Sequence, residues 1–249
     1  MKIQMISKTD REAEFILDGS NPQFANALRR VMMTEVPTAA VDTVDFYYND
    51  SALYDEVVAH RLGMMALKFD LKGFKEGDKI VLVLDKKGPC TVYSSDIKSQ
   101  DADTVSPLFE EVPIVELGEG QKLKVEATVR LGTGKEHAKW QASRSWYSYY
   151  PLVEQKHKVT NGHEVEKACH NGAITVRDGK VEISQECDLA CHADKVAEPK
   201  EAFTLKGSDK KFVFHVESIS GLSAEQIVIS AIDILRDKAK EFGKEVAAL

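Results

Sequence analysis

Three of the four cysteines in this 249-residue chain lie in one segment, at Cys169, Cys187 and Cys191. A Cys-x3-Cys pair with a distant third cysteine has the residue types to bind a metal ion. Structural zinc usually takes four nitrogen or sulfur ligands in two closely spaced pairs. Iron–sulfur clusters take a C-x2-C-x2-C run with a remote fourth cysteine. The segment fills neither template, so we favour no bound metal, and the three cysteines are the candidate ligands if a metal does bind.

Motifs that would indicate catalysis are scarce. The chain has no GxSxG elbow, no HExxH pair and no GxxxxGK[ST] phosphate loop. Gly132-Thr-Gly134 begins a GxGxxG pattern, but His137 stands where its last glycine would be, so the two glycines indicate a turn. His60, His137 and His215 lie in separate predicted elements, and nothing in the sequence places them together. We therefore predict no catalytic residues.

The charge balance and hydropathy pattern exclude several classes of protein. The chain has 33 Lys and Arg against 40 Asp and Glu, a net charge of −7. This argues against a free-standing nucleic-acid-binding protein, which needs a basic surface to displace phosphate counterions. No apolar run approaches the roughly 20 residues of a membrane span, and the N-terminal segment lacks the apolar core of a signal peptide. We expect a cytoplasmic protein.

Hydrophobic periodicity predicts the elements of the first hundred residues. Two strands are expected within 3–5 and 13–17, joined by a polar turn. A helix follows at 22–34, with Ser20 or Asn21 as N-cap, Pro22 in its first turn and Pro37 closing it. The pattern then predicts, in order, a strand at 39–48, a helix at 52–67 and strands within 79–97.

The remaining segments differ in character. The polar stretch 98–119 is predicted to be a solvated loop, and 121–132 a strand. Residues 155–201 contain no Phe, Tyr or Trp, are richer in Cys and His, and show a βαβ-like pattern around 173–184, which indicates a small inserted module. A strand is expected at 210–220.

The last helix opens at Ser223, with Gln226 three residues later completing a possible capping box. An ordinary surface helix confines its apolar residues to a stripe of about 100°. Here the apolar residues between Ile227 and Leu235 point in nearly every direction. Such a helix must be buried on all sides, either by its own domain or by a partner chain, and both alternatives remain open.

The helix near residue 22 carries a family resemblance. The run NPQFANALRRVMMTEVPTAAVDTVDF, followed by HRLGMMAL, closely resembles the α-like assembly subunits of multisubunit RNA polymerases. Within it, Asn26-Ala27-Leu28-Arg29-Arg30 is the family's hallmark helix. GPCTVYSSDI and GTGKEHAKWQ resemble two further family segments, and the whole resemblance covers about residues 10–247.

The inserted module is similar to the ferredoxin-like domain of the archaeal D-type branch, which is related to bacterial α and to the third-largest subunit of eukaryotic polymerase II. A bacterial α would lack this module and would add a basic DNA-reading domain. The resemblance implies an α+β fold, a discontinuous α-like dimerisation domain with an inserted mainly-β domain and a small ferredoxin-like α/β insertion. The implied bounds are 1–40 with 210–249 for dimerisation, 41–154 with 202–209 for the insert, and 155–201 for the ferredoxin-like module.

The resemblance also implies a function without chemistry. Such a subunit pairs with a smaller α-like subunit (L type in archaea), and the pair is the platform for the two large catalytic subunits, alongside other small polymerase subunits. It meets DNA only indirectly, through the complex, and no membrane. The implied dimer interface comprises Phe24, Leu28, Val31, Ile227, Ala231, Ile234 and Leu235. The implied docking residues for the large subunits are Arg29, Arg30, Asp96, His137 and Trp140.

The cysteines depart from the family pattern. If Cys187 begins the cluster run, its next three positions are Ala190, Ala193 and Ala197, and Cys191 lies one place out of register. Cys169 matches the remote ligand. We therefore favour no cofactor, with an iron–sulfur cluster on an incomplete ligand set as the other reading. Two alternative functions follow: an iron–sulfur or redox-sensing electron-transfer module, and a homodimeric α-like scaffold.

Overall fold

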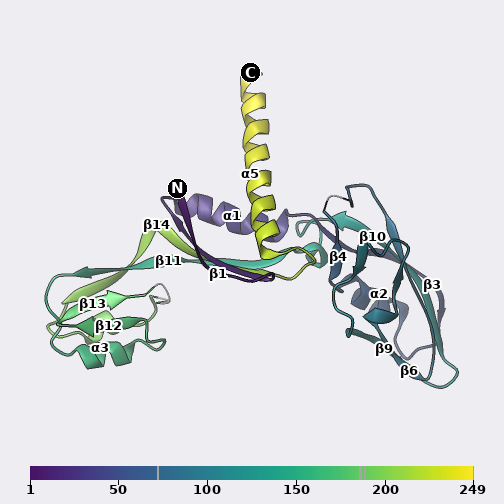
Figure 1. Ribbon diagram of the computed structural model, residues 1–249, viewed down its shortest axis with the longest axis horizontal. Coiled ribbons are helices and arrows are strands. Elements are labelled where there is room, and N and C mark those ends of the chain that lie inside the picture. The colour runs from purple at the N-terminus through teal and green to yellow at the C-terminus, as the bar shows by residue number, and fades with distance from the viewer. Residues whose placement is uncertain (72, 185–186, 188, 249) are drawn as a thin grey trace. The chain divides into compact units, whose positions relative to one another are not determined.

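The computed structural model describes residues 1–71, 73–184, 187 and 189–248, and its elements are labelled in Figure 1. Helices alternate with several sheets, in agreement with the predicted α+β class. The chain divides into two compact units: 1–8, 13–27 and 146–215 form the first, and 9–12, 28–145 and 216–249 form the second. The insertion architecture and domain bounds implied by the resemblance remain predictions.

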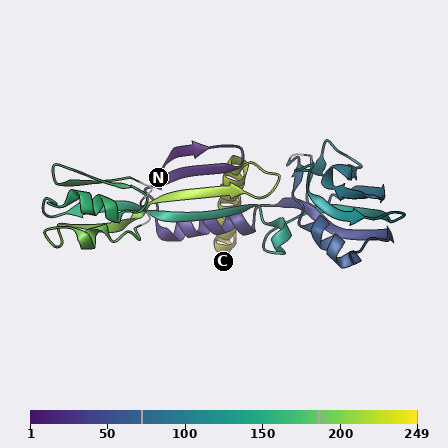
Figure 2. The same cartoon turned by 90° about the horizontal axis from the view of Figure 1, so that it is seen from below.

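A four-stranded sheet is built from both ends of the chain. Its order is β1-β2-β14-β11, and Figure 2 shows the four strands side by side. The strands are β1 (Lys2–Lys8), β2 (Glu12–Asp18), β14 (Phe203–Ser218) and β11 (Ser143–Gln155). β1 and β2 pair antiparallel, as the alternating N-terminal pattern predicts. Phe15 and Phe214 stack with ring centroids 5.2 Å apart, so aromatic packing joins β2 to β14.

Helix α1 (Pro22–Thr34) has the predicted bounds. Asn21 Oδ1 accepts a hydrogen bond from the Phe24 N–H over 2.8 Å, so Asn21 is the N-cap. Ser143 Oγ of β11 donates to the carbonyl of Met32 over 3.0 Å, which holds the end of α1 against the sheet.

The second unit contains a sheet of order β3-β10-β5-β7. Its strands are β3 (Thr38–Asn49), β10 (Lys122–Gly132), β5 (Ile80–Lys87) and β7 (Lys98–Ser99). Two further antiparallel pairs are β4 (Leu67–Phe69) with β8 (Val105–Pro107) and β6 (Cys90–Tyr93) with β9 (Pro113–Leu117). Helix α2 (Asp55–Gly63) and the short 3₁₀ turns η1 (Ser94–Asp96) and η2 (Ala138–Trp140) also belong to this unit.

Two expectations for this unit are wrong. The stretch 98–119 is not a solvated loop, because it supplies β7, β8 and β9, and Ile114, Val115 and Leu117 are buried. Strand β9 is mostly apolar and pairs with β6. Burial of its apolar side chains determines the structure of this stretch more than the charged residues around it do. The helix expected at 52–67 is shorter, since the chain leaves α2 after Gly63 and enters β4 at Leu67.

The small module within the first unit contains α3 (Gly162–Ala168), β12 (Ile174–Arg177), β13 (Lys180–Ile183) and α4 (Ala193–Val196). The βαβ-like expectation around 173–184 is wrong, because β12 and β13 pair directly as an antiparallel hairpin. Its turn residues Asp178 and Gly179 have φ of 51° and 78°. Positive φ at both central residues, with an Asp-Gly sequence, is typical of a type I′ hairpin turn.

Helix α5 (Ala224–Ala247) begins with the predicted capping box. Ser223 Oγ accepts from the Gln226 N–H over 3.2 Å, and Gln226 Oε1 accepts from the Ser223 N–H over 2.8 Å. No helix among the described residues is long and apolar enough to cross a membrane.

Candidate functional site

The outer half of α5 has no cover from its own chain. Ala224, Ile227 and Ala231 are buried, but every described residue from position 236 onward is exposed. The chain itself therefore buries only the first turns of α5, and within the stretch 227–235, which is apolar on nearly every side, Ile229 and Ile232 are exposed. Of the two alternatives, burial on all sides by the helix's own domain fails for that stretch.

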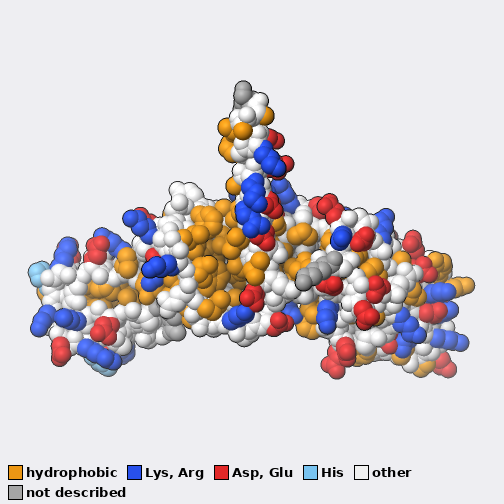
Figure 3. Space-filling view, turned by 45° about the horizontal axis from the view of Figure 1, so that its top comes forward, with side chains coloured by type: hydrophobic (Ala, Val, Ile, Leu, Met, Phe, Trp, Pro, Cys, Tyr) orange, Lys and Arg blue, Asp and Glu red, His pale blue; other side chains and the backbone are white. Residues whose placement is uncertain are grey.

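An apolar stripe runs along the uncovered helix. Its members recur at intervals of four and three residues, which places them on one face. We call this face the α5 stripe: Val228, Ile232, Leu235, Ala239, Phe242 and Val246. Phe242 is 70% exposed and Val246 51%. Figure 3 shows hydrophobic side chains along one side of α5 and charged side chains along the other.

The residues expected at the dimer interface fall into two groups. Four are buried within the chain itself: Leu28, Val31, Ile227 and Ala231. The other three are partly exposed: Phe24, Ile234 and Leu235. The interface assignment remains a prediction for all seven. The exposed stripe residues Ile232, Phe242 and Val246 were missed, although their heptad spacing with Leu235 is visible in the sequence.

The two arginines of α1 differ in exposure. Arg30 is exposed, and its carbonyl accepts a hydrogen bond from Thr34 Oγ1 over 2.8 Å. Arg29 is half-buried, and its Nη1 lies 3.4 Å from Met33 Sδ. Arg30 is thus the arginine of the pair with the more accessible side chain.

The turn between β10 and β11 is fastened to the end of α1. A Cβ on Gly134 would lie 2.6 Å from the carbonyl oxygen of Met33, so a glycine is needed for this close approach. The Lys135 N–H donates to the carbonyl of Thr34 over 2.9 Å. A Cβ on Gly132 would lie 2.5 Å from the Trp140 ring. These contacts confirm the predicted turn and explain both of its glycines.

Arg130, Asp42 and Lys139 form a charged network beside this turn. Arg130 Nε donates to Asp42 Oδ2 over 2.8 Å, and Lys139 Nζ donates to Asp42 Oδ1 over 2.9 Å. Burial alone would raise the pKa of Asp42, but these two hydrogen bonds outweigh it and hold that pKa below its usual value. Both cations also lie over the Trp140 ring, at 4.2 and 4.1 Å from a ring centroid. Trp140 is 3% exposed, so its ring is buried beneath the turn and packs against the two cations.

Asp96 and His137 hold turns through their side chains. Asp96 forms an ion pair with Lys86 Nζ over 2.6 Å and accepts from the Tyr93 N–H over 3.0 Å. The hydrogen bond from Lys86, followed by that from Tyr93, lowers the pKa of Asp96. His137 is exposed, and its Nδ1 accepts from the Lys139 N–H over 3.1 Å at the start of η2. Docking of the large subunits by these residues remains a prediction.

Two of the three scattered histidines lie near each other after all. His60 and His137 line one shallow pocket of about 190 Å³, together with Asp42 and Lys139. The sequence offered no signal for this, because the residues come from α2 and from the 132–141 turn. His215 stacks on Trp146 instead, with ring centroids 5.1 Å apart.

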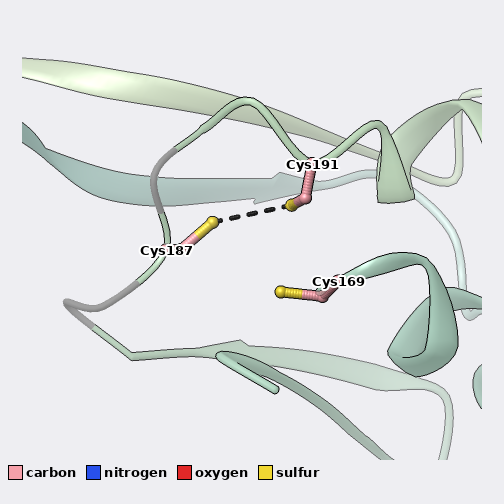
Figure 4. Close-up of side chains that lie close together, drawn as sticks. All are labelled: Cys169, Cys187 and Cys191. Carbon is pink, nitrogen blue, oxygen red and sulfur yellow. Dashed lines mark hydrogen bonds between the residues drawn. The ribbon is translucent and has the colours of Figure 1, made fainter. Parts of the chain in front are cut away.

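The three candidate cysteine ligands meet in the core of the small module. Their Sγ atoms all lie within 4.8 Å of one another, and Figure 4 shows the side chains converging from three segments. Cys187 Sγ and Cys191 Sγ are 3.7 Å apart, although Cys191 is out of register in the family pattern. Burial raises the pKa of Cys191 to about 12, so without a cation this thiol keeps its proton at neutral pH.

Comparison with known proteins identifies the family. Residues 14–239 match the RNA polymerase Rpb3/Rpb11 dimerisation domain. The chain therefore belongs to this family of α-like polymerase subunits. It is a non-catalytic assembly subunit of a DNA-directed RNA polymerase.

Several curated relatives resemble the chain over nearly their whole length, and each carries the name DNA-directed RNA polymerase subunit Rpo3. The relative from Pyrococcus horikoshii is 38% identical and is covered to 99%, against 100% of this chain. The relative from Methanothermobacter thermautotrophicus is 36% identical, with 97% of each chain covered. The relative from Archaeoglobus fulgidus is 35% identical, over 98% of this chain and 97% of its own. None of these names refers to a cofactor, so the iron–sulfur electron-transfer alternative is not supported.

Proposed function

We propose that this chain pairs with a smaller α-like subunit of the archaeal L type, and that the pair is the platform on which the two large catalytic subunits and other small polymerase subunits assemble. The observation that carries this proposal is the uncovered α5 stripe. A monomer that exposes several turns of apolar helix face has left an interaction surface open.

The outer half of α5 is stabilised as a helix without a partner. Arg236 pairs with Asp233 over 2.9 Å and Lys240 pairs with Asp237 over 3.1 Å, both at i,i+3 spacing. Such pairs each stabilise a helix by about 0.2–0.5 kcal/mol. Lys238 forms a further ion pair with Glu35, the residue that directly follows α1. The stripe is therefore presented on a formed helix, which reduces the entropy cost of binding.

The apolar character of the stripe supports a helical partner surface. Full burial of a Phe or Val side chain contributes about 1.5–3 kcal/mol. Side chains spaced by four and three residues match the knobs-into-holes packing of two helices. A smaller subunit with an apolar helix face of its own would complete the burial that the sequence of α5 requires.

The test compares two double variants in co-expression with the smaller subunit. Phe242→Ala with Val246→Ala removes the end of the stripe, and Lys240→Ala with Lys244→Ala makes the same kind of truncation on the charged side. A well-packed interface side chain costs about 2 kcal/mol when truncated. Since every 1.4 kcal/mol is about tenfold in affinity, the stripe variant should bind at least about 100-fold more weakly.

The lysine variant should bind as the unaltered chain does. Equal affinity of the stripe variant, or an equal loss in the lysine variant, would contradict the proposal. Light scattering of the chain alone tests the homodimeric alternative, because a discrete dimer that the stripe variant abolishes would assign the stripe to self-association.

Docking of the large subunits is a separate part of the proposal. Arg30 is exposed near the end of α1, and the 132–141 turn is fastened to that same end through Met33 and Thr34. The guanidinium group offers a rigid fork of donors suited to carboxylate or carbonyl groups of a partner. We propose Arg29, Arg30, Asp96, His137 and Trp140 as the docking residues, with Arg30 as the most accessible arginine of α1.

A further inference from the structure

The end of strand β3 presents two consecutive tyrosines to solvent. Tyr47 is 53% exposed and Tyr48 is 56% exposed. Successive side chains of a regular strand point to opposite faces of the sheet, so the two rings would ordinarily lie apart. β3 is an edge strand of the sheet β3-β10-β5-β7, and a departure from regular strand geometry brings its two rings together.

A β-bulge in β3 turns both rings to one face of the sheet. Tyr48 is paired with Lys124 of β10. Phe46 is paired with the next residue of β10, Val125, so Tyr47 is the extra residue of the bulge. Directly paired side chains share a face, which places Tyr48 on the face of Lys124 and away from the buried Val125. A bulge disrupts the hydrogen-bond ladder, and bulges at sheet edges commonly re-aim a side chain towards a functional site.

Lysines of the two neighbouring strands complete this face. Lys122 Nζ lies 5.0 Å from the centroid of the Tyr48 ring, and Lys124 Nζ lies 5.3 Å from that of the Tyr47 ring. The two lysines are two residues apart on β10, so their side chains share a face. Lys87 of β5 is paired directly with Lys122 and lies on that face too. We call this surface the tyrosine–lysine patch: Tyr47, Tyr48, Lys87, Lys122 and Lys124.

The patch carries cations that its own chain does not neutralise. Lys122 Nζ forms an ion pair with Asp85 Oδ1 over 3.5 Å. Among the residues that the structure describes, neither Lys87 nor Lys124 forms an ion pair. The next carboxylate on this face, that of Glu126, already accepts a hydrogen bond from a patch tyrosine over 3.2 Å. Like charges that lie directly opposite each other destabilise a sheet, so an anion bound beside Lys87 and Lys122 would relieve a repulsion.

The side chains of the patch indicate the kind of partner that it fits. Tyrosine is enriched at protein interfaces, where it offers a rigid and amphipathic contact surface at low cost in entropy. Unpaired lysines attract carboxylates of a partner. A single-stranded nucleic acid would also stack on aromatic rings, but the net charge of −7 repels a long polyanion more strongly than a short segment. A protein segment with carboxylates and one apolar side chain fits the patch best.

We propose that the tyrosine–lysine patch binds an acidic segment of a protein partner, with its carboxylates beside the unpaired lysines and an apolar side chain across the two rings. The patch shares no residue with the α5 stripe or with the residues proposed to dock the large subunits. This proposal and the assembly proposal can therefore fail separately.

The experiment titrates the full chain into a fluorescein-labelled glutamate peptide with one central phenylalanine and follows the fluorescence anisotropy. The peptide should bind at low salt and more weakly as the salt concentration rises. Tyr47→Ala with Tyr48→Ala should weaken binding at least about tenfold, and Lys87→Ala with Lys124→Ala about fivefold. Tyr54→Ala is the matched control for the rings, because Tyr54 is 81% exposed and belongs to none of the three strands. It should bind as the unaltered chain does.

A measurement on the unaltered chain guards against variants that fail to fold. Acetylation of lysines by acetic anhydride, located by mass spectrometry, should slow at Lys87 and Lys124 when the peptide is added and should be unchanged at Lys244 of α5. The proposal is overturned if the peptide does not bind, if the tyrosine variant and Tyr54→Ala bind alike, or if the peptide leaves acetylation unchanged. Tighter binding of a single-stranded DNA oligonucleotide at the same lysines would equally overturn it, because the patch would then be a nucleic-acid site.

Discussion

Arg130 on β10 and Asp42 on β3 share a hydrogen bond of 2.8 Å between Nε and Oδ2, across 88 positions of sequence. The guanidinium group of Arg130 also lies over the Trp140 ring and donates from Nη1 to Glu136 over 3.2 Å. One arginine therefore joins two neighbouring strands to the turn that is fastened to α1.

The Asp42 contact predicts a pH dependence of stability. The pKa of Asp42 is lowered in the folded chain, so its contribution is fully present above the unfolded value of about 3.9 and is lost as the pH falls through the folded value. Asp42→Asn should cost about 1 kcal/mol at neutral pH and should flatten the fall in unfolding free energy below about pH 4. Urea unfolding followed by tryptophan fluorescence measures both. Asp45→Asn on the same strand is the control, and an equally flattened profile in that variant would refute the assignment.

The close approach of Gly134 to α1 predicts a cost for any side chain there. Gly134→Ala would place a methyl group 2.6 Å from the Met33 carbonyl oxygen and 3.2 Å from the Thr34 Cα. Overpacking of this kind typically costs about 1–3 kcal/mol. Thermal unfolding of the full chain should show the loss.

The control for that variant is the same substitution on α5. Gly243 has no neighbouring atom within 4 Å of an added Cβ, so Gly243→Ala should stabilise the helix by up to about 1 kcal/mol. If Gly134→Ala were as stable as the unaltered chain, the turn would not be tightly held against α1.

Arg30 separates the two steps of assembly. Arg30→Ala should leave the pair with the smaller subunit intact and weaken recruitment of the large subunits, because the fork of donors is lost from the docking surface. Reconstitution by titrating the pair into the large subunits measures this. Arg177→Ala, an exposed arginine on β12, is the matched control. Full recruitment by the Arg30 variant, or failure of the pair to form, would contradict the two-step assignment.

Local signals were sufficient for some elements. The bounds of α1 followed from Pro22, an N-cap candidate at Asn21 and the terminating Pro37, all adjacent in sequence. The capping box of Ser223 and Gln226 likewise located the start of α5. In both cases the N-cap side chain accepts a hydrogen bond from the backbone N–H three residues along, so no tertiary information was needed to locate the start of the helix.

Other features depended on contacts distant in sequence. Strand β9 was missed because five residues between charged segments become a strand only when β6 pairs with them. The direct pairing of β12 and β13 could have been predicted from the sequence, because Asp178-Gly179 is typical of a hairpin turn. The βαβ-like expectation did not take this turn into account. The sequence did not reveal that Cys191 and Cys169 converge. The cysteine run of the family, when started at Cys187, falls on Ala190, and Cys191 lies one residue away from that position.

The uncovered half of α5 bears on the fate of copies made in excess of their partner. About three turns of formed helix would present Phe242 and Val246 to solvent, and exposed apolar surface is what chaperones and proteases recognise. We expect unpaired chains to be removed by this surveillance while paired ones persist. The supply of the partner would then set the number of subunits that survive, without any dedicated regulator.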